Sequence, residues 1–580
     1  MNKYKKYIKK NWYCFLLGPV FMTLEACGEF IMPFINANII DIGAANGDIP
    51  YILKNGFYML LIAIAMLITG VLGAFFAIRG ASRMAAGVRQ DTFDKVQTFS
   101  FSDIDRFSTG SLITRVTNDI TQIQNFTQSL LRGCFRSPIM LVGALIMSFV
   151  LNPDIAWVIL TVVPFLAIAT FLIIKIASPR YTAMQKQLDT LNTGIGEAIT
   201  NEKVIKSFVR EEYEKDKFRI INSKLMDKSI AALKMMILMQ PISALAINAT
   251  TLVVVWIAGK QIMVGGMEIG TLTAFITYLS QVMTSLNFLA NIFLQGTRAA
   301  ASDRRISEVL NTTSAISDEK SAEKDHKIKS GDIEFCDVTF RYFKYNHTPV
   351  LDKINVKINS GELVGIIGST GSGKTTLVSL IPRLYDADEG AVFVDGVNVR
   401  DLSLYELREN VSVVLQKNTL FSGTVAENLR WGNENATDEE LVAACQIAQA
   451  DGFISSFPDG YDTEIGQGGG NLSGGQKQRL CIARALLKKP KIMILDDSTS
   501  AVDTATDACI RRAFREQLSD ITKLIIAQRI SSVMDADKII VMDKGAIIAI
   551  GTHNELIRNC KTYQEIYYSQ KDREEVQSYE

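Results

Sequence analysis

The sequence predicts a helical membrane domain of six spans, with long helical extensions beyond the membrane, fused to an α/β domain. Long uncharged runs fill roughly the first 300 residues. The composition then changes at a charged linker, and strand-like sequence leads into a glycine-rich loop and a helix-like stretch. These observations divide the chain into a membrane domain (1–310), a linker (311–330) and an α/β domain (331–580).

Six apolar runs predict the membrane spans. A spanning helix needs about 20 mostly apolar residues. The runs lie at about 12–40, 56–79, 135–153, 155–175, 235–260 and 269–297. Only the first is interrupted by charge in its interior, at Glu25 and Glu29. So many long uncharged runs disfavour the alternative of buried helices in a soluble protein.

The basic residues predict the orientation. The connecting segments 41–54 and 260–268 carry few bases, whereas 79–132 and 175–234 are dense in lysine and arginine. Because basic loops stay on the cytoplasmic side, we expect the long loops, the lysine-rich N-terminus and the α/β domain to be cytoplasmic. A bacterial plasma membrane is the expected location.

The long basic loops are themselves helical in pattern. Apolar residues recur at three- and four-residue spacing, which indicates membrane helices that continue into the cytoplasm. Breaks near 100–112 and 203–216 predict two short transverse helices there.

Composition excludes several other classes. Basic and acidic residues both total 61, so net charge predicts no nucleic-acid partner. The eight cysteines are scattered without a CxxC pair, which argues against a metal site or a disulfide framework.

A phosphate-binding loop follows the apolar run LVGII. It fits G-x-x-x-x-G-K-[ST] and precedes a helix-like stretch, as the motif requires. Its glycines let backbone N–H groups surround phosphate, its lysine reaches the terminal phosphates, and its threonine can ligate Mg²⁺. The predicted nucleotide-binding residues are Gly368, Ser369, Thr370, Gly371, Ser372, Gly373, Lys374, Thr375 and Thr376.

Two further motifs complete a nucleotide site. The apolar strand IMIL ends in Asp496, which can hold the Mg²⁺ shell, followed by Asp497. The second motif, LSGGQ, precedes a helix, where a hydroxyl, glycine N–H groups and the positive helix end form an anion site. It comprises Leu472, Ser473, Gly474, Gly475 and Gln476.

Together these motifs resemble those of ATP-binding cassette transporters, specifically half-transporters with exporter-type membrane domains. The resemblance covers essentially the whole chain and implies that ATP and Mg²⁺ are the cofactors. It implies that Tyr342 stacks on adenine and that Gln416 lies near the Mg²⁺ held by Thr375 and Asp496. It further implies that Ser500 and Asp503 belong to a loop at a dimer interface.

The chain departs from the family pattern at two positions. Asp497 stands where the family has the glutamate that polarises the attacking water, and Gln528 stands where it has histidine. Aspartate is one methylene shorter, and a displacement of about 1 Å can cost about 100-fold in rate. Glutamine cannot carry the charge of imidazolium.

With two such changes in one nucleotide site, the chain resembles the degenerate subunit of heterodimeric multidrug exporters. In that family, two cassettes pair head to tail, and each site combines one chain's phosphate loop with the other chain's LSGGQ. The resemblance therefore implies a second, non-identical half-transporter that keeps the glutamate and histidine. This chain would complete the working site of that partner.

The sequence is compatible with several functions and transported compounds. An exporter of amphipathic drugs, lipids or peptides is the main one. The alternatives are an importer of a metal chelate or other solute on the same fold, a homodimeric exporter of low ATPase activity, and an ATP-binding regulatory or channel-like protein. Glu25 and Glu29 lie four residues apart on one helix face and either favour cationic amphiphiles or pair with bases of neighbouring helices.

Overall fold

A computed structural model describes residues 2–318, 323, 325–342, 348–498 and 501–579. The chain divides into two compact units. The first comprises 1–97 and 110–312, and the second comprises 98–109 and 313–580. A short stretch from within the helical half thus groups with the α/β domain. The division confirms the expected fold class of a helical domain joined to an α/β domain.

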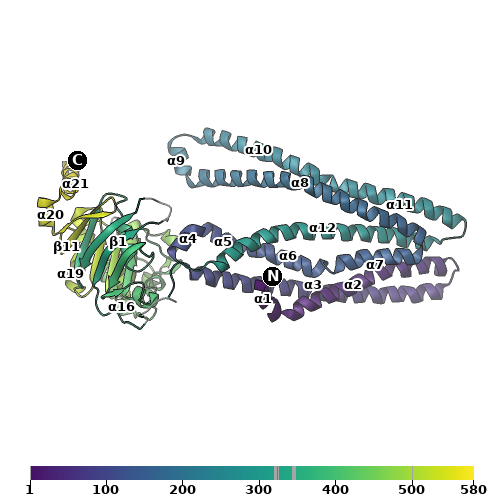
Figure 1. The fold of residues 1–580 in the computed structure, drawn as a ribbon, viewed down its shortest axis with the longest axis horizontal. Helices are drawn as coiled ribbons and strands as arrows, with labels where there is room; N and C mark the ends of the chain where they lie inside the picture. The colour runs from purple at the N-terminus through teal and green to yellow at the C-terminus, as the bar shows by residue number, and fades with distance from the viewer. Residues whose placement is uncertain (1, 319–322, 324, 343–347, 499–500, 580) are drawn as a thin grey trace. The chain divides into compact units, whose positions relative to one another are not determined.

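The first unit is entirely helical in its described residues (Figure 1). Helices lie at all the six predicted spans: α2 (Trp12–Asn38), α3 (Ile49–Gln97), α7 (Arg136–Leu151), α8 (Pro153–Thr200), α11 (Met239–Met263) and α12 (Ile269–Asn311). The remaining helices of this unit include α1 (Lys5–Lys10), α5 (Thr109–Thr114), α6 (Ile120–Gly133), α9 (Glu202–Ser207) and α10 (Glu211–Ile237).

Several helices are far longer than a membrane is thick. Helix α3 has 49 residues and α8 has 48. At about 1.5 Å per residue, each spans about 70 Å, against about 30 Å for the hydrocarbon core. These helices therefore continue well beyond the bilayer.

Four helical stretches in the described residues are long and apolar enough to cross a membrane, judged by length and composition. They are Trp12–Ala44, Ile49–Gln97, Thr109–Leu151 and Ala244–Met263. The predicted spans within α8 and α12 stay predictions.

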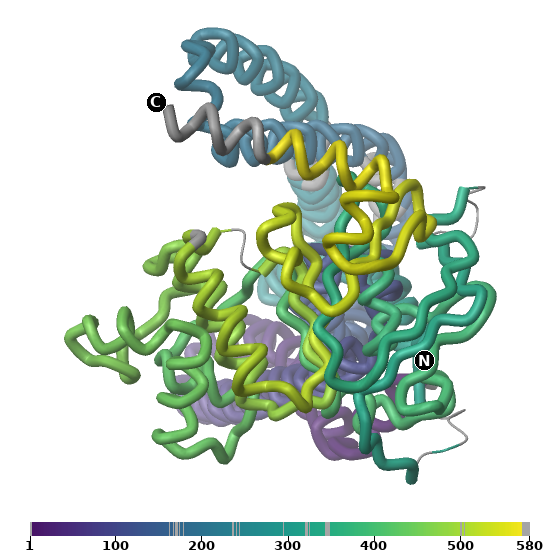
Figure 2. Tube along the Cα trace, turned by 90° about the vertical axis from the view of Figure 1, so that its left-hand side faces the viewer, coloured from purple at the N-terminus to yellow at the C-terminus, as the bar shows by residue number. Residues whose placement is uncertain are grey.

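Short helices occupy the two predicted breaks. Helix α4 (Phe101–Phe107) begins at Ser100, whose side chain and that of Asp103 form a capping box. Helix α9 joins α8 to α10, and these two long helices lie side by side (Figure 1, Figure 2).

The described residues of the second unit form three sheets. The main sheet has the order β12-β11-β3-β10-β9-β6. Its strands are β3 (Leu363–Gly368), β6 (Val411–Val414), β9 (Ile492–Asp496), β10 (Thr522–Ile526), β11 (Lys538–Asp543) and β12 (Ala546–Gly551). Strands β6, β9, β10, β3 and β11 are parallel, and β12 is antiparallel to β11. Buried parallel strands read as continuous apolar runs, as IMIL and LVGII do.

The two smaller sheets are antiparallel. One has the order β2-β1-β4-β5, from β1 (Ile333–Phe340), β2 (Leu351–Ile358), β4 (Glu389–Val394) and β5 (Val397–Asn398). The other pairs β7 (Gly423–Thr424) with β8 (Glu464–Ile465).

Helices surround these sheets. They are α13 (Lys374–Ser379), α14 (Leu404–Asn410), α15 (Val425–Arg430), α16 (Asp438–Ile447), α17 (Asp451–Ile454), α18 (Gly474–Leu487), α19 (Thr504–Gln517), α20 (His553–Asn559) and α21 (Lys561–Tyr579). Two apolar clusters form the core of the unit, and both include residues of the central strands β3, β9 and β10. The carboxyl ends of those strands are thereby fixed, and they carry the candidate site.

Candidate nucleotide site

The phosphate loop joins the central strand β3 to helix α13. Gly368 ends β3 with a φ of 156°, and a Cβ placed there would lie 2.1 Å from the carbonyl oxygen of Met542. Gly373 caps α13 with a φ of 95°. Only glycine fits these two positions without strain. The sequence motif therefore folds into the tight loop that a phosphate group requires.

Lys374 holds the loop together from within. Its Nζ donates hydrogen bonds to the carbonyl oxygens of Gly368 (2.9 Å) and Ser369 (2.8 Å). Burial lowers the pKa of Lys374, while the nearby Asp496 and Asp497 carboxylates raise it. The side chain thus already lies along the loop that it would serve when phosphate binds.

The predicted Mg²⁺ ligands meet at the ends of adjoining elements. The Thr375 hydroxyl lies 3.1 Å from an Asp496 carboxylate oxygen. Asp496 is 3% exposed, and this burial raises its pKa, which the Thr375 hydrogen bond partly offsets. Hydroxyl and carboxylate oxygens are ligands that Mg²⁺ accepts. The pair therefore fits the predicted cation.

The two departures from the family pattern contact one another. The Gln528 amide Nε2 donates to an Asp497 carboxylate oxygen at 2.7 Å. Burial raises the pKa of Asp497, and hydrogen bonds from Gln416 and Gln528 oppose that rise. The residue has a φ of 49°, a left-handed conformation that aspartate tolerates better than most residues. The structure thus brings together all three residues that were predicted to be catalytic, Asp497, Gln528 and Gln416.

The LSGGQ motif begins helix α18 as predicted. The Ser473 hydroxyl accepts from the Gln476 N–H (3.3 Å), and the Gln476 side chain accepts from the Ser473 N–H (2.9 Å). Leu472 is buried, and Gly474 and Gly475 form the first turn. A Cβ at Gly475 would lie 2.8 Å from the Ala501 carbonyl oxygen. The motif is therefore packed directly against the loop that follows β9.

Sequence reasoning missed the residue that links these two loops. Gln478, 4% exposed, accepts a hydrogen bond from the Ala501 N–H (3.0 Å) and donates to the Asp497 carbonyl oxygen (3.5 Å). It follows the motif by two positions, and no spacing rule distinguishes it from its polar neighbours. It ties this chain's signature helix to its own catalytic strand.

The predicted interface loop is described in part. Asp503 caps α19 by accepting from the Thr506 N–H at 2.9 Å, which lowers the pKa of Asp503. Ser500 lies outside the described residues.

Tyr342 lies beside the phosphate-loop helix. Its hydroxyl is 3.0 Å from the Thr376 hydroxyl, and its ring packs edge-on against Phe340 and Tyr385. The ring is 39% exposed, so part of it stays available for stacking.

Replacing Tyr342 with alanine is expected to weaken ATP binding about tenfold, since stacking on a base contributes about 1–3 kcal/mol. Tyr342→Phe keeps the ring and loses only the Thr376 hydrogen bond, so it should bind nearly as tightly as the parent chain. Equilibrium titration with a fluorescent ATP analogue measures both. Equal losses in the two variants would show that the hydroxyl, not the ring, is what matters.

The first transverse helix contacts the α/β domain within the second unit. The Tyr385 hydroxyl donates to Asp105 of α4 at 2.8 Å, and its ring lies 6.1 Å from that of Phe101. Because Tyr385 also packs against Tyr342, a continuous set of contacts joins α4 to the phosphate-loop helix. The sequence alone gave no reason to select Tyr385.

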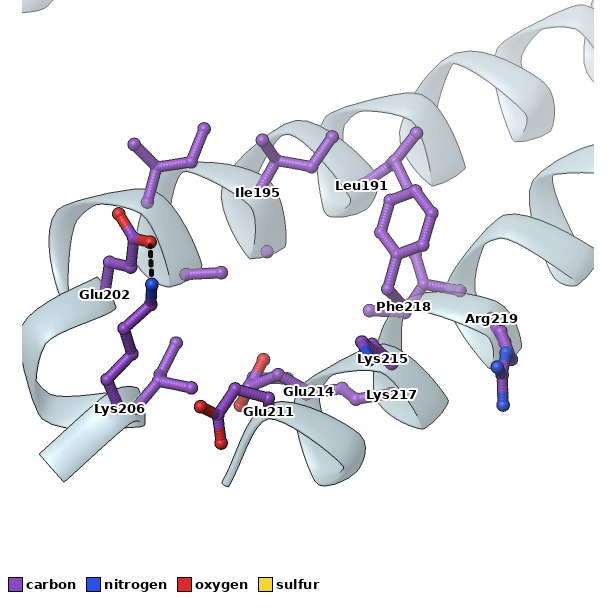
Figure 3. A pocket seen from close by; sticks show the side chains of 15 residues that line it. Leu191, Ile195, Glu202, Lys206, Glu211, Glu214, Lys215, Lys217, Phe218 and Arg219 are labelled. Atoms are coloured by element: carbon purple, nitrogen blue, oxygen red, sulfur yellow. Dashed lines mark hydrogen bonds and ion pairs between the residues drawn. The ribbon is translucent and has the colours of Figure 1, made fainter. Parts of the chain in front are cut away.

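The second transverse helix, α9, lies at the closed end of the α8–α10 hairpin. A cavity of about 720 Å³ lies between the helices there, lined by Leu191 and Ile195 of α8 and by Phe218 of α10, with charged residues around it (Figure 3). Just beyond α9, Phe208 and Val209 are 73% and 81% exposed. This end of the first unit presents apolar side chains without a partner in the described residues.

The two glutamates of the first span meet a base from a neighbouring helix. Arg136 of α7 forms an ion pair with Glu29 and lies 3.8 Å from Glu25. Glu25 and Glu29 thus lie beside a base of a neighbouring helix, which is the second of the two environments that the sequence predicts for them.

Comparisons with known proteins identify the family. The family model for the ABC transporter transmembrane region matches residues 15–286, and the ABC transporter model matches residues 351–500. The chain is 36% identical to the ABC transporter ATP-binding protein YfiB of Bacillus subtilis over the full length of both. It is 33% identical to the putative multidrug export ATP-binding/permease protein YgaD of the same organism, over 98% of each.

A solved structure shows the same fold. A bacterial Atm1-family ABC exporter with ATP bound matches 96% of this chain and 99% of its own, with a TM-score of 0.82 and 24% identity. The family resemblance stated from the motifs is therefore confirmed. The chain belongs to the ABC transporter family and is an ATP-driven half-transporter of the exporter type.

Proposed function

We propose that this chain is the degenerate subunit of a heterodimeric exporter. Its own site holds ATP and hydrolyses it slowly, and its LSGGQ completes the working site of a non-identical partner chain. The phosphate loop, Asp496 and the signature keep the residues and contacts that nucleotide binding needs.

The contact between Asp497 and Gln528 carries this proposal. A general base must lie within about 3 Å of the water that it activates, and the shorter aspartate side chain falls short of the glutamate position. In addition, amide donors from Gln528 and Gln416 engage its carboxylate. Hydrogen bonds to the ionised form lower its basicity and oppose the rise in pKa that burial causes at Asp497. The shorter side chain and the Gln528 amide thus both act on one carboxylate.

The remaining residues are arranged to bind rather than to cleave. Lys374 and the loop N–H groups would hold the phosphates, and Thr375 with Asp496 and Gln416 would hold the cation. Mg²⁺, when bound, neutralises charge on the phosphate oxygens. Tyr342 would stack on the adenine.

The two transverse helices supply the mechanical link in this proposal. Contacts from α4 through Tyr385 reach the nucleotide site of this chain. The exposed Phe208 and Val209 beside α9 provide an apolar surface on which the partner's cassette would dock. The N-terminus and cassette would be cytoplasmic, as the basic loops predict.

Export of an amphipathic compound is the transport direction that we propose. The likeness to YgaD, described as a putative multidrug exporter, supports it. Accumulation of a dye in inside-out but not right-side-out vesicles would distinguish export from the importer alternative.

Purification of the tagged chain from its native membranes tests the pairing. We expect a second half-transporter to co-purify at a one-to-one ratio and to carry glutamate and histidine at the two altered positions. Recovery of this chain only with itself would contradict the heterodimer and leave the homodimeric alternative.

A further inference from the structure

The C-terminal helix α21 contacts the segment that follows strand β10 and carries Gln528. We propose that Gln570 of α21 is a positioning residue that holds Gln528 against Asp497 and so restrains ATP hydrolysis at this chain's site. The inference rests on the function proposed above, in which the Gln528 amide engages the Asp497 carboxylate. It gives the C-terminal helix a part in the nucleotide site.

The Gln570 amide binds the backbone on both sides of Arg529. Its Nε2 donates to the Gln528 carbonyl oxygen at 2.8 Å, and its Oε1 accepts from the Ile530 N–H at 2.9 Å. Only one orientation of the amide satisfies both contacts, because its nitrogen donates and its oxygen accepts. This one side chain therefore fixes two backbone positions, one before and one after Arg529.

These contacts lie where the chain leaves the main sheet. Just before them, the Ala527 N–H donates to the carbonyl oxygen of Ile366 on β3 at 3.2 Å. Just after them, the chain turns into a short 3₁₀ helix, Ile530–Ser532. Gln570 thus holds the backbone of Gln528 at the point where the sheet ends and that helix begins.

Helix α21 is anchored in the core of the α/β domain. Tyr563 is 0% exposed, and its hydroxyl lies 2.7 Å from Nδ1 of His553. Ile566 packs against the same apolar cluster that contains Ile530. Since residues three and four apart share one face of a helix, Gln570 continues the face that Tyr563 and Ile566 begin. The amide is therefore held by a fixed element.

Through Gln528, this anchoring reaches the candidate base. The Gln528 Nε2 donates to Oδ2 of Asp497 at 2.7 Å. A general base must lie within hydrogen-bond reach of its water, at about 3 Å. A carboxylate oxygen that accepts from a fixed amide is less available to that water. Release of the Gln528 backbone would let the amide move away and leave the oxygen to the water.

A double-mutant cycle tests the inference. The full-length chain would be purified without its partner, as a pair of identical copies, and its phosphate release measured over a range of ATP concentrations. Gln570→Met keeps the length of the side chain and removes both hydrogen bonds. We expect it to raise kcat about fivefold, as the loss of one or two ordinary hydrogen bonds would, with an unchanged KM for ATP. In a Gln528→Ala background, the same change should have no effect, because the residue through which it acts is gone.

The matched control is Gln564→Met on the same helix. The Gln564 amide also donates to two backbone carbonyls, those of Ile557 (2.8 Å) and Arg558 (3.3 Å) in α20. This variant loses the same kind of contact away from Gln528 and should turn over ATP like the parent. Hydrogen exchange at the Ile530 amide should become faster in Gln570→Met and stay unchanged in Gln564→Met.

Three results would overturn the inference. They are a kcat in Gln570→Met at or below that of the parent, an equal gain in Gln564→Met, and the same gain from Gln570→Met in the Gln528→Ala background. Each variant is compared with its own parent chain. Rapid hydrolysis by the parent would therefore contradict the proposed slow site, whereas failure of this cycle would contradict only the role of Gln570.

Discussion

Replacing Asp497 by glutamate and Gln528 by histidine together is expected to raise ATP turnover at this chain's own site about 100-fold. The longer side chain moves the carboxylate about one bond length towards the attacking water. Histidine removes the Gln528 amide that now donates to the carboxylate at 2.7 Å, and it can carry positive charge towards the γ-phosphate. Turnover by the chain purified without its partner, as a pair of identical copies, measures the gain, because both sites then combine this chain's phosphate loop with its own LSGGQ.

The single variants and one isostere control this experiment. Asp497→Glu alone should gain less than the double change, since Gln528 still engages the carboxylate. Asp497→Asn keeps the size of the aspartate and should fall to background. Parent turnover equal to that of the double variant would show that Asp497 serves as a fully competent base.

Replacing Gly475 by aspartate is expected to reduce turnover of the two-chain transporter by at least about 100-fold, the loss typical of removing charge stabilisation at a reacting phosphate or oxyanion. A side chain there would meet the Ala501 carbonyl oxygen at 2.8 Å and place a negative charge beside the partner's nucleotide. Steady-state phosphate release measures the loss.

A matched change in the same segment separates charge at the motif from general damage. Gly470 has helical backbone angles, and a Cβ there would lie 3.7 Å from the nearest atom, so Gly470→Asp should retain turnover. Lys374→Met in this chain should cost less than Gly475→Asp, because it disables only the slow site. The reverse ranking would contradict the proposed division of labour.

Much of the fold could be predicted because membrane thickness and strand burial leave direct traces in sequence. Uncharged runs marked the helices of the first unit, and LVGII and IMIL marked buried parallel strands. The spacing of apolar residues predicts that α3 and α8 extend beyond the membrane, but it does not locate the ends of these helices. Ends depend on local caps and tertiary contacts, such as the Ser100 capping box at α4.

The motif residues of the site could also be predicted, since phosphate and Mg²⁺ binding need fixed residue types at fixed spacing. Their supporting contacts could not. Gln478 contacts Ala501, and Tyr385 contacts Asp105, and both partners are distant in sequence. No spacing of polar or aromatic residues in the sequence predicts contacts of this kind. Likewise, the sequence did not identify Arg136 of α7 as the partner of Glu25 and Glu29, because that contact depends on the packing of α7 against α2.

The most direct test of the central claim compares the two catalytic positions in the assembled transporter. Phosphate release would be measured for Asp497→Asn in this chain and, separately, for glutamine in place of the partner's catalytic glutamate. We expect the partner's substitution to abolish turnover, whereas Asp497→Asn should leave most of it. Equal loss from the two substitutions would contradict it.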